Sequence, residues 1–230
     1  MKLLPGVQAV DLALLYKDHL IIGDLQLGYE QVAQRRGTLI PKFQLQDILE
    51  RLGKIFHRVH AKTLIINGDV KHEFGSILEQ EWREVLQFFD FCLHHVQEII
   101  VVKGNHDLVI DPIAQKRNIK VVDSYRIDNI LIFHGHTLLK KTAPAMIIGH
   151  EHPAISFKEK PGDKFKCFLV GSWKNSTLLV MPSFNPLTDG SDVTKERFLS
   201  PYLKQGIDQF LVYVIEDKVY PFGIVKDLLV

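Results

Sequence analysis

The sequence is poor in cysteine, and its two cysteines are far apart. Cys92 and Cys167 match no CxxC or zinc-finger spacing, which argues against a zinc finger or a disulfide framework. Each lies in an apolar stretch, so we predict two buried free thiols. Free thiols fit a reducing, cytoplasmic compartment.

The sequence also has little net charge and no long hydrophobic run. Its formal net charge is +1, which gives no sign of a strongly cationic surface for nucleic acid or membrane. No apolar run approaches the roughly 20 residues of a membrane span. Residues 1–5 are too short and too soon interrupted by proline for a signal peptide. We therefore expect a soluble cytoplasmic protein without a membrane partner.

The composition is ordinary for a globular domain with a sizeable core. Of the 230 residues, 46% are hydrophobic and 24% charged. No internal repeat, low-complexity tract or domain boundary interrupts the chain, so residues 1–230 are predicted to form a single domain.

Strands and helices alternate in the first half, whereas short strands dominate the second. The amphipathic spacing predicts helices at 29–36, 41–61, 76–96 and 112–117; Ser76 to Glu79 forms a capping box, and Pro41 suits a first helical turn. Strands are predicted at 7–15, 19–23, 63–66, 98–103, 119–122, 130–133, 145–148, 154–157, 165–170, 177–181, 209–216 and 219–224. Residues 182–204 are expected to be a long ordered loop. The fold class is therefore α/β, with layered mixed β-sheets flanked by helices.

Five of the apolar runs end in a polar cluster. These clusters are Asp24-Leu-Gln26, Gly68-Asp69, Gly104-Asn105-His106-Asp107, His134-Gly-His136 and Gly149-His150-Glu-His152. Any one of them alone could be turn chemistry, such as an Asp that closes a turn. Together they would meet at one rim of a sheet, where open α/β sheets place ligands. Carboxylate, amide and imidazole groups without cysteine suit divalent ions such as Mn²⁺, Fe²⁺ or Zn²⁺.

This ordered set of motifs, which spans residues 24–152, resembles the calcineurin-like metallophosphoesterase superfamily. The segment 181–190 is also similar to one in a small prokaryotic branch described as ICC-like or related to DNA-repair nucleases. The resemblance implies a metallophosphoesterase fold and a phosphoester hydrolase that uses two divalent metals, with Mn²⁺ expected and Fe²⁺, Zn²⁺ and Ni²⁺ as alternatives.

The resemblance also implies a role for each matching residue. One metal would take Asp24, Gln26, Asp69 and His152, and the other Asp69, Asn105, His134 and His150. His106 would lie beside the substrate phosphate, with Asp107 as its orienting partner. His136 is expected beside the ligands without binding a metal, and His72 near the substrate. Two such metals activate a water and clamp the phosphoryl oxygens.

One position departs from the family. Gln26 stands where the family has histidine, and an amide oxygen is a weaker ligand than imidazole for borderline metals. We expect the first metal to bind more weakly or to be a harder ion such as Mn²⁺. The alternative is that the side chain of residue 26 points away from the site.

Three functions compete. The first is a metal-dependent phosphoester hydrolase, a phosphodiesterase rather than a monoesterase. The second is a DNA or RNA nuclease, in which His72 and a lysine-rich segment flank a phosphate backbone; those lysines are Lys158, Lys160, Lys164 and Lys166. The alternative without a function is that these lysines form a solvated face of a strand. The third is a weakly catalytic metal-binding interaction protein, suggested by Gln26.

Overall fold

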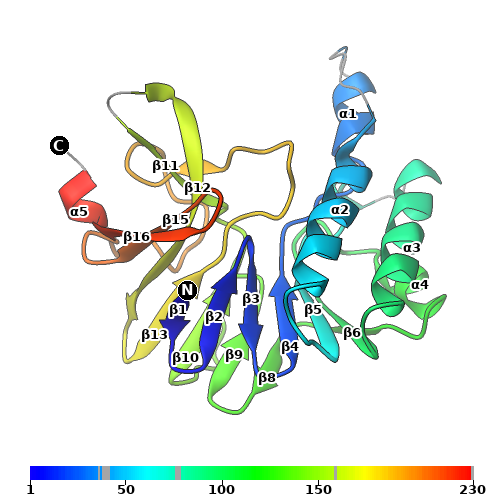
Figure 1. The fold of residues 1–230 in the computed structure, drawn as a ribbon, viewed down its shortest axis with the longest axis horizontal. Helices are drawn as coiled ribbons and strands as arrows, with labels where there is room; N and C mark the ends of the chain where they lie inside the picture. Colours follow the sequence, from blue (N-terminus) through cyan, green and yellow to red (C-terminus); the bar gives the residue numbers. More distant parts are fainter. Residues whose placement is uncertain (36, 38–41, 76–78, 158–159, 229–230) are drawn as a thin grey trace.

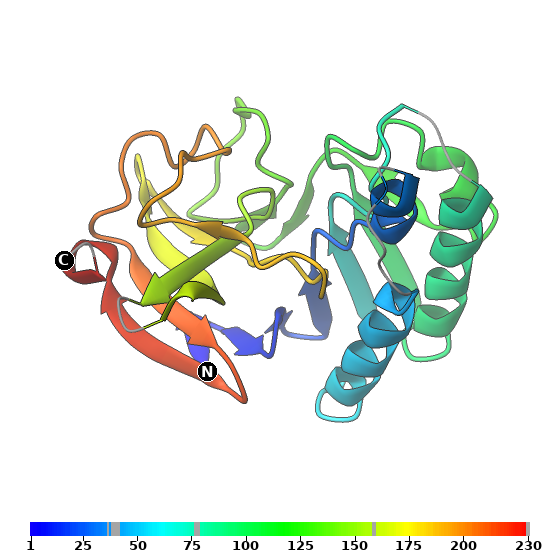
Figure 2. The ribbon, with the colours of Figure 1, turned by 90° about the horizontal axis from the view of Figure 1, so that it is seen from above.

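Two β-sheets pack against each other, and helices cover the outer face of the first sheet (Figures 1 and 2). The computed structural model describes residues 1–35, 37, 42–75, 79–157 and 160–228. Buried hydrophobic residues from both sheets, including Ile66 and Ile148, belong to one continuous core cluster. The predicted α/β class with mixed sheets is confirmed.

The first sheet has seven strands within the described residues, and they follow chain order. They are β1 (Lys2–Leu4), β2 (Val7–Val10), β3 (Ala13–Tyr16), β4 (His19–Ile22), β5 (Thr63–Asn67), β6 (Glu98–Val102) and β7 (Lys120–Val122). Strands β1 to β4 are antiparallel, whereas β4 to β7 run parallel. Every residue of β5 is buried, as expected for a parallel strand covered on both faces.

The second sheet carries the remaining strands. They are β8 (Tyr125–Ile127), β9 (Ile130–Ile132), β10 (Ala145–Ile148), β11 (Pro153–Phe157), β12 (Lys160–Trp173), β13 (Ser176–Val180), β14 (Ser191–Asp192), β15 (Leu211–Ile215) and β16 (Val219–Ile224). At its centre β9, β10 and β13 are parallel neighbours. The carboxyl ends of β9 and β10 therefore lie side by side.

The helices are α1 (Tyr29–Arg35), α2 (Gln44–Phe56), α3 (Glu79–Leu93), α4 (Asp111–Gln115) and α5 (Val225–Leu228). Helix α2 buries Ile48, Leu52 and Ile55, which share one helical face because they are spaced four and three residues apart. Its first turn is capped from α1, because the Glu30 carboxylate accepts the backbone N–H groups of Phe43 and Gln44, each at 2.7 Å.

Several predicted boundaries need correction. The run 7–15 is two strands, because the chain turns at Asp11, whose φ is +57°. Helix α2 is shorter at both ends than the predicted 41–61. Helix α3 packs Phe88 and Cys92 into the core, whereas Trp82 is only half-buried. Strands β1, β8 and β14 were not predicted, and β14 lies within the expected loop 182–204. The predicted strand 165–170 is the middle of the longer β12. The capping box at 76–79 and Pro41 lie in part or wholly outside the described residues.

Both cysteines are free and buried, as predicted. Burial raises the pKa of Cys92 and of Cys167, so both thiols stay protonated near neutral pH. Among the described residues, no helix combines the length and apolarity needed to cross a membrane.

Candidate metal centre

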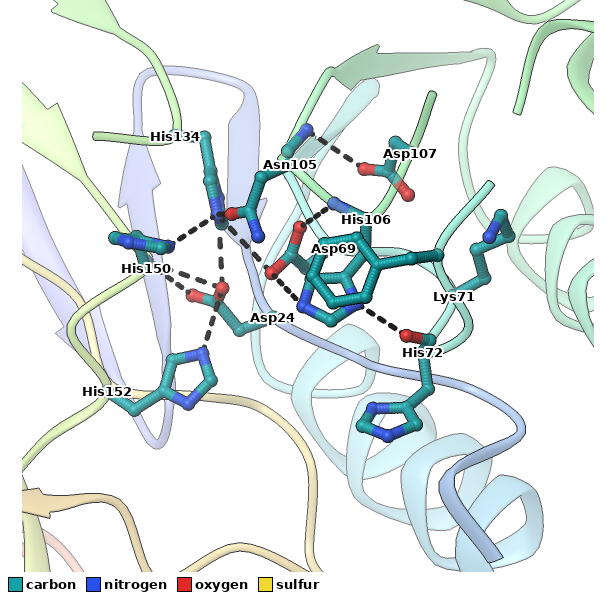
Figure 3. Close-up of polar contacts among 12 residues, drawn as sticks. Asp24, Asp69, Lys71, His72, Asn105, His106, Asp107, His134, His150 and His152 are labelled. Atoms are coloured by element: carbon teal, nitrogen blue, oxygen red, sulfur yellow. Dashed lines mark hydrogen bonds and ion pairs between the residues drawn. The ribbon is translucent and has the colours of Figure 1, made fainter. Parts of the chain in front are cut away.

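The predicted polar clusters follow the carboxyl ends of strands from both sheets. Asp24 follows β4, Asp69 follows β5, Asn105 and His106 follow β6, His134 follows β9, and His150 and His152 follow β10. Since β4, β5 and β6 are parallel neighbours, as are β9 and β10, each sheet delivers its residues to one edge. The two edges meet, and the side chains point toward one another across the junction (Figure 3).

Asp69, His134 and His150 form the tightest group. One ligand atom from each lies within 4.8 Å of the others. His134 Nε2 is 3.4 Å from Asp69 Oδ2, 3.2 Å from His150 Nδ1 and 3.1 Å from Asn105 Oδ1. Donor atoms about 2.1 Å from one ion lie roughly 3 Å apart at right angles, so this spacing fits a divalent cation held by these four side chains.

Asp24 and His152 form a second pair beside this group. His152 Nε2 lies 3.0 Å from Asp24 Oδ1, yet it makes no hydrogen bond with any described residue. A buried nitrogen that faces a carboxylate oxygen without a hydrogen bond fits two ligands aimed at a shared cation. Asp24 is held in place by the backbone N–H of His150, which donates to Oδ2 at 3.1 Å.

The backbone at these positions is unusual. Asp24, Gln26, Asp69, His150 and His152 all have positive φ, between +48° and +67°. Few residues other than glycine adopt this left-handed region, although Asp and His do so more readily than most. Backbone strain of this kind concentrates at functional sites, where the surrounding structure holds it.

Three glycines make room for the ligands. A Cβ atom at Gly68 would lie closer than 3.0 Å to the His134 ring, one at Gly104 equally close to Asp69, and one at Gly149 equally close to Asp24. Each glycine directly precedes a predicted ligand in the sequence. In each Gly-Asp, Gly-Asn or Gly-His pair, the second residue is a predicted ligand, and the glycine leaves space for the side chain of a different predicted ligand.

Buried negative charge dominates the centre. The carboxylates of Asp24 and Asp69 are almost fully buried. Burial opposes protonation of His134, but the nearby carboxylates of Asp69 and Asp24 outweigh it and raise the pKa of His134 to about 9. Burial works against ionisation of Asp69 too, yet His134 and His106 hold the pKa of Asp69 well below its usual range. Buried charges of one sign are stable when paired or bound to a metal, so the electrostatics also fit a cation.

His106 is fixed from behind. Its Nδ1 donates to the backbone carbonyl of His72, and a carbonyl can only accept, so Nδ1 carries the hydrogen. Its Nε2 faces the centre, 3.8 Å from Asp69 Oδ2. The His72 ring stacks on the His106 ring with centroids 5.6 Å apart. His72 thus lies beside the centre and orients His106 through its main chain.

Asp107 has a different contact from the one expected. Its fully buried carboxylate accepts the N–H groups of Val70 and Gly104, each at 3.0 Å, whereas His106 bonds to the His72 carbonyl. Burial and the nearby Asp69 carboxylate raise the pKa of Asp107 to about 6. Asp107 therefore ties the turn after β5 to the turn after β6, rather than orienting the His106 ring directly.

Gln26 and His136 lie at the edge of the centre. The Gln26 N–H donates to the Asp69 carbonyl at 2.8 Å, and its own carbonyl accepts from Gln44 Nε2 at 2.9 Å. These contacts place its backbone at the rim, and metal binding by its side chain stays a prediction. The His136 ring is 5.3 Å from the His134 ring and 6.0 Å from the His150 ring.

The segment after β13 supports the turn at Asp24, which the sequence pattern did not reveal. Ser183 Oγ donates to the Asp24 carbonyl at 2.7 Å, and the Phe184 N–H donates to the Gly23 carbonyl at 3.0 Å. The side chain of Gln44 donates to Asn185 Oδ1 at 3.0 Å. The sequence feature that could have indicated this supporting role is a polar segment that directly follows a buried strand.

Two of the four lysines considered as a phosphate-binding face, Lys164 and Lys166, are engaged elsewhere. Lys164 binds Glu196 at 2.6 Å and the Gly190 carbonyl at 3.0 Å, and Lys166 binds the carbonyls of Ser183 and Asn185. They hold the segment after β13 in place. Lys158 lies outside the described residues, and the side chain of Lys160 is not among those described.

Comparison with known proteins shows the family of the chain. Residues 19–154, more than half of the chain, match the calcineurin-like phosphoesterase family. The chain therefore belongs to the calcineurin-like metallophosphoesterases, a family of hydrolases. The family suggests a divalent-metal site, and Asp69, His134 and His150 form a group that could hold a metal ion. No curated protein sequence matches the chain significantly.

A solved nuclease structure shares the fold. The Pseudomonas putida nuclease MPE aligns with a TM-score of 0.65 and 18% sequence identity, over 91% of this chain and 91% of that one. The E. coli phosphoesterase Yfce aligns with a TM-score of 0.39 and 14% identity, over 91% of this chain and 94% of that one.

Proposed function

We propose that the chain is a phosphodiesterase that uses two divalent metals bridged by Asp69. The observation that carries this proposal is the convergence of Asp69, His134 and His150, whose ligand atoms lie within 4.8 Å of one another, with Asn105 and Asp24 alongside. Mn²⁺ is the proposed ion, since carboxylate and amide oxygens supply much of the donor set. We also propose that residues 1–230 act as one domain, because both sheets share one hydrophobic cluster.

Each side chain has a proposed task. Asp69, Asn105, His134 and His150 would hold one ion, and Asp24, Asp69 and His152 the other, with Gln26 as a further candidate. Bound metals supply an activated water and charge neutralisation for the phosphoryl group. Asn105 contributes a neutral oxygen, which leaves the centre electrophilic toward an anionic phosphate.

His106 is the proposed proton donor to the leaving oxygen. The His72 carbonyl fixes Nδ1 as the protonated nitrogen, which leaves Nε2 directed at the centre. When Nε2 also carries a hydrogen, the ring is an imidazolium, and it can pass that hydrogen to a departing alkoxide and return to the neutral form with Nδ1 protonated. Asp107 keeps the two turns around the centre in register.

Space for a substrate lies next to these residues. A cavity of about 470 Å³ is lined by His134, His136 and Leu108, among others. Another cavity, of about 700 Å³, lies between α2 and α3 and includes none of the site residues. The ester is placed in the first cavity, because His134 and His136 of the centre line it.

Hydrolysis of bis-p-nitrophenyl phosphate tests the proposal. We expect turnover that requires Mn²⁺ and falls more than about 100-fold in Asp69→Ala and Asn105→Ala, since even residues that merely support metal ligands cost 10–100-fold. Asp217→Ala, an exposed turn position, is the control and should keep full activity. Turnover without added metal after chelation, or turnover that survives Asp69→Ala, would contradict the proposal. Retained metal with negligible turnover would favour the non-catalytic interaction protein instead.

A further inference from the structure

Phe74 is an exposed aromatic ring placed against the proposed proton donor. Its ring centroid lies 3.6 Å from that of His106, with the planes inclined by 36°. At the same time 53% of Phe74 is exposed to solvent. A single exposed hydrophobic residue needs no explanation, but this one covers an imidazole of the centre and presents the rest of its ring to solvent.

Phe74 belongs to a row of rings beside the metal ligands. His106 stacks on His72 at 5.6 Å, and His72 meets Tyr29 edge-on at 4.9 Å. The row therefore places aromatic rings along one side of the centre, with Phe74 as its exposed end. Surfaces of this kind recognise planar groups through stacking rather than through charge.

The position of Phe74 identifies which part of a substrate it would touch. His106 Nε2 faces Asp69, so an oxygen that receives its hydrogen lies next to that ring. The substituent carried by this oxygen must leave the centre past the ring that packs on His106. Phe74 therefore borders the leaving-group side of the ester.

Three of the lysines considered for phosphate binding or lining the cavity already have partners within the protein. Lys164 and Lys166 are engaged as described, and Lys103, which lines the cavity beside the centre, pairs with Asp111 at 2.8 Å. Affinity for a base-bearing ester would then depend on stacking more than on neutralising phosphates. Such binding weakens only modestly with salt, because few counterions are released.

From these observations we infer that Phe74 is a specificity-determining residue that stacks on a nucleobase of a phosphodiester substrate. The inference rests on the proposed phosphodiesterase function and names its substrate class. Because the base must be free to lie on the ring, unpaired strands and dinucleotides fit better than an intact duplex.

This inference is tested by removing the Phe74 ring from the protein and a base from the substrate, separately and together. The substrates are the dinucleotide d(TpT) and two analogues, each of which lacks one of the two bases. For the wild type with Mn²⁺, we expect one analogue to have a kcat/KM about tenfold lower than d(TpT), within the range that base stacking supports. Phe74→Ala should lower kcat/KM for d(TpT) by a similar factor and should cleave that analogue no more slowly than d(TpT). Phe74→Tyr should retain the preference, and Phe74→Leu, which keeps apolar bulk without a flat ring, should lose it.

The control and the contrary outcomes separate this inference from the proposed function. Phe222→Ala removes another exposed phenylalanine, 42% exposed on β16, and should leave the base preference unchanged. If the wild type hydrolyses bis-p-nitrophenyl phosphate but base preference is equal in the wild type and Phe74→Ala, the role of Phe74 is refuted and the phosphodiesterase proposal stands. If the wild type hydrolyses none of these esters, both fail.

Discussion

At the scale of single residues, the centre depends on the missing side chains of three glycines as much as on the side chains that converge there. Gly68, Gly104 and Gly149 each lack a Cβ atom where a neighbouring ligand side chain lies. The ligand that follows each glycine is directed by the same turn. In each glycine-ligand pair, one residue places a predicted ligand and its neighbour leaves room for another. This arrangement accounts for the recurrence of such pairs at the ends of strands.

Gly104→Ala tests this arrangement. The new methyl group would meet the carboxylate and backbone nitrogen of Asp69 closer than 3.0 Å, and such overpacking costs about 1–3 kcal/mol. We expect a lower Tm and at least tenfold weaker Mn²⁺ binding by calorimetry. Gly162→Ala, where no atom lies within 4 Å of the added carbon, is the matched control. Equal Mn²⁺ affinity in Gly104→Ala and the wild type would contradict the account.

The convergence of these side chains could largely be predicted from the sequence, because each proposed ligand follows an apolar run. Asp24, Asp69 and His150 could be chosen in this way since strand ends are visible in the sequence. The contacts of Asp107 and His106 could not, because they depend on how two turns fold against each other. Phe74 likewise gave no periodic signal, as it lies in a turn rather than in a strand or helix.

At the scale of elements, β12 and the segment after β13 together support the turn that carries Asp24. Lys166 on β12 donates to the carbonyls of Ser183 and Asn185, and Ser183 Oγ in turn donates to the Asp24 carbonyl. A strand of the second sheet therefore helps to position a ligand that follows a strand of the first. This connection gives β12 a role in the site although it carries no ligand.

The pH dependence of stability should report on Lys166. Burial lowers the pKa of Lys166 from 10.5 to about 7. Between those two values the unfolded chain binds a proton that the folded chain does not, so this residue makes the free energy of unfolding rise with pH. Below about pH 7 both states are protonated and the contribution is constant.

Urea unfolding of the wild type and of Lys166→Met at pH 7, 8 and 9 measures this contribution. We expect the wild type minus variant difference in unfolding free energy to increase with pH. Lys166→Arg, which stays charged throughout, should lack the rise as well. A difference that is constant over this range would show that the amine is not deprotonated in the folded protein.

Elements were predicted best where hydrophobic pattern and burial coincide. The apolar run of β5 is buried along its whole length, and the stripe on α2 faces the core. The turn at Asp11 escaped prediction because its backbone conformation interrupts an otherwise continuous apolar stretch. Strand β12 is longer at both ends than the predicted 165–170. Its first part, 160–164, escaped prediction because it is polar while still pairing with β11.

At the scale of the whole molecule, the site exists only because two sheets meet. Asp24, Asp69 and Asn105 come from the first sheet, whereas His134, His150 and His152 come from the second. Neither sheet alone offers the full donor set. Packing of the shared hydrophobic core is therefore also what assembles the centre, so that folding and ligand placement are coupled.

Anomalous diffraction from crystals grown with Mn²⁺ can locate the proposed pair of cations that share Asp69. We predict two manganese peaks about 3.5–4 Å apart, with the Asp69 carboxylate between them, one peak beside His134 and His150 and the other beside Asp24 and His152. A single peak, or peaks remote from Asp69, would contradict the proposal.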